Sequence, residues 1–146
     1  MFSVNLKDLP LKETYVEGVP QQRAYSTFPF LGSGANENIS LVYFELNPGE
    51  ELGAHTDSAE EALLIIKGRV EVIVGDEKAI VEAPGLAIVP EMVLHNLRNV
   101  GEGRAKVAGF FPSRYLVATF DNEWQPDGTH VIDTKQIEQM LAQIGA

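Results

Sequence analysis

Short apolar runs alternate with turn residues along the middle of the chain, with turns about every 8 to 12 positions. Ile39–Leu46 is apolar enough for a strand that is buried on both faces. Val70–Val74 instead alternates between two faces, as a half-buried strand does. Strands this short and this regularly interrupted predict an all-β barrel or sandwich. The turns fall at Asn47–Gly49, Lys67–Gly68, Gly75–Asp76, Ala83–Gly85 and Gly101–Gly103.

The hydrophobic period changes after Asp133. Apolar residues then recur with the spacing of an amphipathic helix, which we expect over about residues 134–144. Asp133 and Gln136 fit a capping box at its start, and Gly145 suits its end. The apolar positions of this helix are Ile137, Met140, Leu141 and Ile144.

Composition narrows the class of protein. A chain of 146 residues allows one domain with one sizeable core. The formal charge of −10 argues against a nucleic-acid groove, which needs a basic stripe. The start of the chain lacks the pattern of a signal peptide, and the longest apolar run, Ala62–Ile66, is too short to cross a bilayer. We therefore expect a cytoplasmic protein that binds neither nucleic acid nor membrane.

The candidate chemistry lies around two of the three histidines, since the chain has no cysteine. Side chains alternate along a strand, so His55 and Asp57 point to the same face. A strand that begins near Glu61, and a neighbouring strand that carries His95, would bring two imidazoles and one or two carboxylates together. This convergence predicts a metal site. Glu60 has the opposite parity and is expected to point to solvent.

The spacing of these residues resembles the two motifs of the cupin family. The first, G(X)5HXH(X)3-4E(X)6G, is matched by a glycine, His55, Asp57, Glu61 and a second glycine, with Asp57 where the family has its second histidine. The second, G(X)5PXG(X)2H(X)3N, is matched with one residue fewer before the proline and Met92 in place of its later glycine. The remaining matched residues are Gly49, Gly68, Gly85, Pro90, His95 and Asn99. The match covers about residues 39–111, and residues 109–128 are similar to the tails of small quercetin-dioxygenase-like cupins.

This resemblance implies a double-stranded β-helix, or jelly-roll barrel, with an N-terminal arm and a short C-terminal helix. The single domain would comprise an arm and loop (1–38), a barrel core (39–120) and a tail with the helix (121–146). The resemblance further implies a homodimer. The arm either packs on the outside of its own barrel or pairs with the second subunit.

The resemblance also implies a site. His55, Glu61 and His95 carry over as ligands of a divalent metal (Mn, Fe, Ni or Zn), with positions left open for water, substrate or oxygen. Asp57 is either a further ligand or a base that orients metal-bound water. Asp57 and Glu61 are therefore the candidate catalytic residues.

Two functions stay open at this point. One is a metalloenzyme that acts on a small molecule at the barrel mouth, as a dioxygenase or an isomerase. The other is a non-catalytic module that binds a small ligand, with a degenerate or structural metal site, which Asp57 and Met92 favour. Strand parity makes Phe44 and Phe111 the candidate pocket residues. His130 follows a turn signature and is expected on a surface loop.

Overall fold

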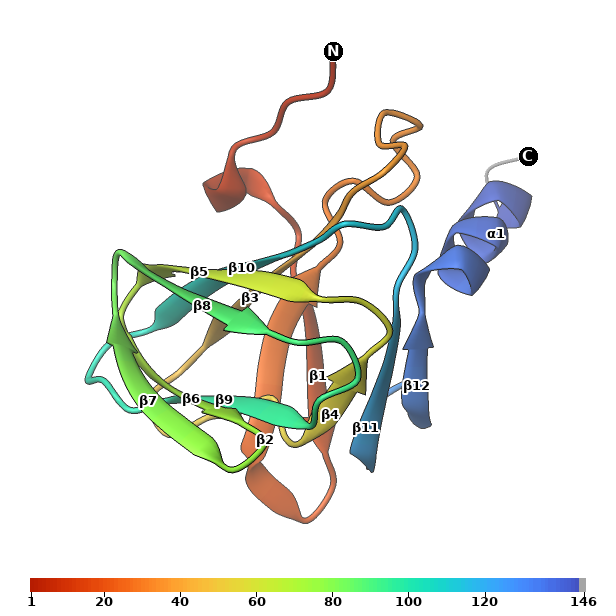
Figure 1. The fold of residues 1–146 in the computed structure, drawn as a ribbon. Coiled ribbons are helices and arrows are strands. Elements are labelled where there is room, and N and C mark those ends of the chain that lie inside the picture. The colour runs from red at the N-terminus through yellow and green to blue at the C-terminus, as the bar shows by residue number, and fades with distance from the viewer. Residues whose placement is uncertain (145–146) are drawn as a thin grey trace.

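Two six-stranded antiparallel sheets form the body of the molecule (Figure 1). The structure is a computed structural model and describes residues 1–144. The first sheet has the order β1-β2-β3-β10-β5-β8, with β1 at Lys12–Val16, β2 at Val19–Thr27, β3 at Ser40–Leu46, β10 at Ala105–Phe111, β5 at Glu61–Lys67 and β8 at Gly85–Val89. The second has the order β12-β11-β4-β9-β6-β7, with β12 at Thr129–Asp133, β11 at Val117–Trp124, β4 at His55–Asp57, β9 at His95–Asn99, β6 at Arg69–Val74 and β7 at Glu77–Glu82.

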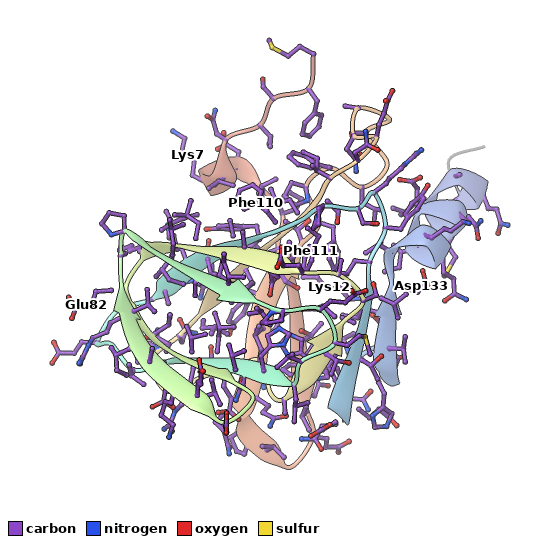
Figure 2. The ribbon with its side chains drawn as sticks, viewed as in Figure 1. Lys7, Lys12, Glu82, Phe110, Phe111 and Asp133 are labelled. Atoms are coloured by element: carbon purple, nitrogen blue, oxygen red, sulfur yellow. The ribbon has the colours of Figure 1, made fainter. Side chains whose placement is uncertain are left out.

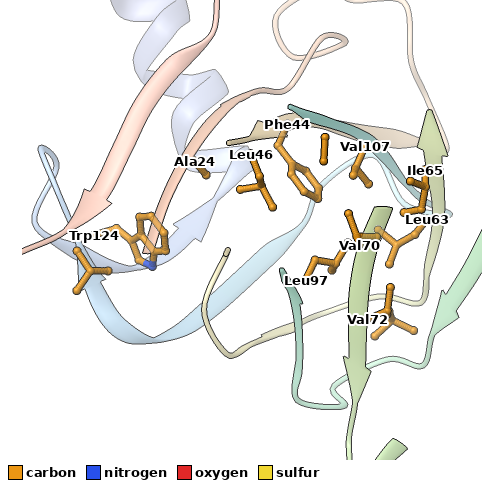
Figure 3. Packing of buried hydrophobic residues seen from close by; sticks show 13 residues of the cluster. Ala24, Phe44, Leu46, Leu63, Ile65, Val70, Val72, Leu97, Val107 and Trp124 are labelled. Atoms are coloured by element: carbon orange, nitrogen blue, oxygen red, sulfur yellow. The ribbon is translucent and has the colours of Figure 1, made fainter. Parts of the chain in front are cut away.

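The core lies between the two sheets (Figure 3). Alternate residues of each strand point inward, so β3 contributes Phe44 and Leu46 while β5 contributes Leu63 and Ile65. The second sheet faces them with residues such as Leu97. The mostly-β fold class expected from the strand pattern is confirmed, and the two antiparallel sheets fit the jelly-roll barrel that the family resemblance implies.

Asn99 connects the turn before the first motif with the turn after the second motif. Its side-chain amide donates to the Leu46 carbonyl at 2.9 Å and to the Gly103 carbonyl at 2.8 Å. The backbone N–H of Gly49, whose φ of 82° suits a glycine, donates to the Asn99 carbonyl at 3.0 Å. The asparagine of the second motif is therefore a structural residue, which fixes the backbone near the histidine strands.

Much of the segment expected as an arm belongs to the first sheet of its own chain. β1 and β2 form a hairpin, and β2 pairs with β3. Tyr15 and Gln125 exchange backbone hydrogen bonds of 3.0 and 2.7 Å, which join β1 to the end of β11. A short 3-10 turn, η1 (Leu6–Asp8), precedes this hairpin. The pairing of β2 with β3 was not foreseen, because it joins residues about twenty positions apart in the sequence.

The C-terminal helix α1 covers Thr134–Ile144, as expected. Asp133 caps it, because its carboxylate accepts from the backbone N–H groups of Lys135 and Gln136 at 3.1 and 3.2 Å. The apolar stripe of the helix, including Met140 and Leu141, is exposed. Gly145, expected at the helix end, lies outside the described residues. No helix among residues 1–144 is long and apolar enough to span a membrane.

Candidate metal centre

The four residues expected at the site come together inside the barrel. His55 and Asp57 lie on β4, Glu61 begins β5 and His95 begins β9. His55 and His95 are direct cross-strand partners in the second sheet. All four side chains are buried. Glu60 is exposed, as its parity predicts.

Three of the four residues form the tightest group. The possible ligand atoms of His55, Asp57 and His95 all lie within 4.8 Å of one another. His95 Nε2 is 3.0 Å from Asp57 Oδ2, and His55 Nε2 is 3.9 Å from the same oxygen. Glu61 Oε1 lies 3.5 Å from His95 Nε2, outside that group of three. The residue that departs from the family motif, Asp57, is thus at the centre of the cluster.

Backbone carbonyls orient both imidazole rings. His55 Nδ1 lies 2.8 Å from the Gly53 carbonyl, and His95 Nδ1 lies 2.9 Å from the Val93 carbonyl. A carbonyl oxygen can only accept, so each Nδ1 carries the proton and donates. Each Nε2 therefore faces the cluster, which is how a histidine is prepared to bind a metal ion.

Two buried polar atoms of the cluster lack a hydrogen-bond partner among the described residues. They are Asp57 Oδ2 and His95 Nε2, which are close together but not aligned for a hydrogen bond. Buried polar atoms are rarely left unpaired, and a place for an ion is one reason why they can be. These two atoms and His55 Nε2 fit a cation.

Comparison with known proteins agrees with this geometry. The family model described as "Cupin domain" matches residues 42–111. The chain contains a cupin domain. No curated protein sequence matches the chain.

Three solved structures with a similar fold are each under 25% identical to this chain. They include a recombinant oxalate oxidase in complex with glycolate (TM-score 0.61, 21% identity, covering 70% of this chain and 57% of that chain). The cupin domain of Schizosaccharomyces pombe Cnp3 has a TM-score of 0.62 at 17% identity, covering 76% and 73%. Oxalate decarboxylase from Bacillus subtilis has a TM-score of 0.59 at 18% identity, covering 74% and 28%. The cupin chain thus spans little more than half of the oxalate oxidase, and the likeness concerns the fold.

Burial and neighbouring charge set the protonation of the cupin site. Burial, assisted by His95, lowers the pKa of His55 to about 4, so this ring is neutral at pH 7. Burial alone would lower the pKa of His95 as well, but the carboxylates of Asp57 and Glu61 outweigh it and raise that pKa to about 10. Burial, then the charge of Asp57, raises the pKa of Glu61. His95 therefore keeps its proton at pH 7, and a metal ion would take the place of that proton.

A cavity of about 110 Å³ adjoins the cupin site. Phe44 and Phe111 line it, where strand parity placed them. Phe120 and Trp124 of β11 also line it, and the Phe120 ring stacks on His55 with centroids 4.6 Å apart. Neither was foreseen as a site residue. Their spacing on one face of β11 was the available signal, but its pairing with β4 is visible only in the fold.

Gly109 and Met92 are two further residues whose roles the sequence did not reveal. A Cβ at Gly109 would stand 2.2 Å from Glu61 Oε2, so only glycine leaves room for that carboxylate. Met92 keeps a positive φ of 61°, and its backbone N–H donates to the Asp57 carbonyl at 3.0 Å. It thus adopts the conformation of the motif glycine that it replaces.

The remaining histidine lies apart from the cupin site. His130 is exposed, as expected, but on strand β12 instead of in a loop.

Proposed function

We propose that this cupin domain holds a divalent metal ion with His55, Asp57 and His95, and acts on a small molecule beside that ion. The observation that carries the proposal is the convergence of two Nε2 atoms on one buried carboxylate oxygen, with both Nδ1 atoms tied to backbone carbonyls. Two imidazoles and a carboxylate form a ligand set that leaves coordination positions free for substrate, which is typical of catalytic divalent metal sites. Mn, Fe, Ni and Zn are the candidate ions, and a carboxylate-containing set favours Mn or Fe.

When bound, such an ion would polarise an oxygen of the substrate or support chemistry with dioxygen. The protein would supply the rest. The buried walls keep water away, and Asp57 links the two histidine strands. Glu61, whose pKa is raised and which lies 3.5 Å from His95, is suited to hold a proton at its carboxylate and to transfer it to or from the substrate. This division of roles supports a dioxygenase or an isomerase.

The metal content of the protein tests the proposal. The protein would be purified without a histidine tag, loaded separately with Mn(II), Fe(II), Ni(II) or Zn(II), desalted and measured by elemental analysis. We expect near-stoichiometric metal, lost in His95→Ala and in Asp57→Asn. His130→Ala is the matched control and should retain the metal, because His130 is exposed on β12. Protein that takes up no metal under any loading would contradict the proposal.

Activity is tested separately. Metal-loaded protein would be screened for oxygen uptake and for isomerisation of enolisable carbonyl compounds. Ligands that bind without turnover would favour the non-catalytic binding module.

A further inference from the structure

The wall of the cavity beside the candidate metal centre is mainly apolar and, within residues 1–144, carries no lysine or arginine side chain. Its one histidine is His55 of the metal centre. Five aromatic rings form much of it, contributed by Phe28, Phe44, Phe111, Phe120 and Trp124. Leucine, valine, isoleucine and alanine side chains provide most of the rest, together with the uncharged polar side chains of Thr14, Ser26, Gln125 and Thr129. The charged groups that line it are acidic, namely Asp57 and Glu61 at the inner end and Asp127 at the rim.

A lysine does reach the rim, but it is already paired. The Lys12 ammonium hydrogen-bonds the Asp127 carboxylate, and both side chains are largely exposed (Figure 2 labels Lys12). Its charge is therefore balanced by Asp127 before any ligand arrives.

An anionic ligand would meet unfavourable surroundings in this cavity. A charge that leaves water needs a partner of opposite sign and hydrogen bonds. The centre itself offers little excess positive charge, because the buried carboxyl groups of Asp57 and Glu61 stand beside any divalent ion bound there. An uncharged ligand has no such requirement.

Trp124 indicates that the ligand carries a hydrogen-bond acceptor. Its side chain is only 8% exposed, and its indole N–H has no hydrogen-bond partner among the described residues. Buried indole N–H groups usually find an acceptor. Because Trp124 lines the cavity, a ligand with an oxygen acceptor can supply the missing partner.

The size of the cavity limits the apolar part of the ligand. The cavity is about 110 Å³, and an apolar cavity of about 150 Å³ is known to stay dry and accept benzene. One ring, or a hydrocarbon group of that size, is therefore the largest unit that fits without movement of the wall.

We propose that the cavity binds an uncharged, mainly apolar molecule and discriminates against carboxylates. The molecule would carry one ring, or a hydrocarbon group as large as one ring, and one oxygen that accepts a hydrogen bond. The proposed metal centre would contact one end of this ligand, and only that part of the proposal depends on the proposed function. It sets this chain apart from the oxalate enzymes that share its fold, since oxalate is a dianion.

Benzamide and benzoate form a matched pair of probes, because they share a shape and differ in charge. The binding of each would be measured by titration calorimetry and by the fluorescence of Trp124, the only tryptophan of the chain, on metal-free and Mn(II)-loaded protein. We expect benzamide to bind at least about tenfold more tightly than benzoate in both forms. Benzoate that binds as tightly as benzamide, or more tightly, would overturn the proposal.

Two pairs of variants locate the binding. Ala118 lines the cavity, whereas Thr119 faces outward on the same strand, β11. Ala118→Leu should therefore weaken the binding of benzamide at least about tenfold, and Thr119→Leu should leave that binding unchanged. Phe111 and Phe110 stand on opposite faces of β10 (Figure 2), so Phe111→Ala should admit 2-naphthamide, which the wild type and Phe110→Ala should exclude. The second pair decides the matter if Ala118→Leu does not fold. Unchanged benzamide binding in folded Ala118→Leu would place the ligand elsewhere and overturn the proposal.

The test separates this proposal from the proposed metal centre. Protein that takes up no metal but prefers benzamide would refute the metal centre and leave the cavity assignment standing. Protein that takes up metal but prefers benzoate would support the metal centre and refute the cavity assignment.

Discussion

Met92 occupies a backbone conformation that glycine adopts at lower cost. A non-glycine residue with left-handed backbone is strained by about 1–2 kcal/mol, whereas glycine loses about 0.5–1 kcal/mol more chain entropy on folding. We therefore expect Met92→Gly to raise the free energy of unfolding by about 0.5 kcal/mol, and Met92→Val to lower it by about 1 kcal/mol or more, because a β-branched residue is crowded there. Urea denaturation measures both changes.

The neighbouring residue provides the control for Met92. Glu91 is also exposed, but Met92 is the only non-glycine residue with positive φ among those described. Glu91→Gly should therefore lower stability by about 0.5–1 kcal/mol. If both glycine variants lost stability equally, backbone strain at Met92 would be refuted.

Gly109 matters because of what stands opposite it. The Cβ of Gly109→Ala would lie 2.2 Å from Glu61 Oε2 and 3.1 Å from a methyl group of Val42, so the buried carboxylate must move. We expect a loss of about 1–3 kcal/mol of stability, as for other overpacked cores. Gly103 has ordinary φ and no atom within 4 Å of its added Cβ, so Gly103→Ala should change stability by less than about 0.5 kcal/mol. Denaturation curves that coincide for the two variants would contradict this account.

At the scale of elements, a polar cluster ties β3 to the turns around it. The Glu45 carboxylate accepts from the Tyr43 hydroxyl at 2.6 Å and from the Arg104 guanidinium, and Arg104 also donates to the Asn47 side chain at 3.0 Å. The Arg104 guanidinium further lies over the ring of Tyr25 on β2. The cluster thus connects three segments that are distant in sequence.

This cluster predicts a pH dependence. Burial would raise the pKa of Glu45, but the hydrogen bonds from Tyr43 and Arg104 outweigh it and lower that pKa below 4.5. A carboxyl whose pKa is lowered on folding stabilises the fold above its unfolded pKa and loses that contribution as the pH falls through the folded pKa. We expect Glu45→Gln to be about 1 kcal/mol less stable than the wild type at pH 7, with the difference shrinking as the pH falls below 4.5. Chemical denaturation across this range measures it, and a difference that stays constant with pH would contradict the assignment.

The sequence predicted some structural elements well and others poorly. The barrel strands and α1 followed from local periods of two and 3.6 residues, which need no knowledge of distant contacts. The convergence of His55, Asp57, Glu61 and His95 followed from motif spacing and strand parity. The hairpin of β1 and β2 did not, because its pairing with β3 joins residues about twenty positions apart. The aromatic residues of β11 were missed for the same reason, and the division of the chain into arm, core and tail stays a prediction.

At the scale of the whole molecule, the outer face of the first sheet is apolar and is open toward the edge strand β8, although Ala108 on β10 is buried. Phe110, Ala62 and Ile88 are aligned across β10, β5 and β8, and Ala108, Leu64 and Leu86 form a parallel row. Leu86, Ile88 and Phe110 are 75%, 66% and 41% exposed. β8 is an edge strand of its sheet. Contiguous apolar patches next to a free sheet edge are unusual on monomers.

We therefore expect a homodimer in which this face of one copy meets the same face of another around a two-fold axis. Ile88→Lys should convert the dimer to a monomer in sedimentation-velocity experiments, because it buries a charge in the contact. Val131→Lys, an exposed position on β12 in the second sheet, should remain dimeric. A wild type that sediments as a monomer at micromolar concentration would contradict the expectation.

The carbonyls that orient His55 and His95 come from residues two positions earlier on the same segments. The direction in which each imidazole points thus depends on a few residues that are adjacent in the sequence. Most of the cavity wall, by contrast, comes from strands other than the histidine strands β4 and β9. Mutation can therefore reshape the wall while leaving the ligand geometry intact. Over evolutionary time, the molecule that is accepted and the ion that is held can change as separate traits.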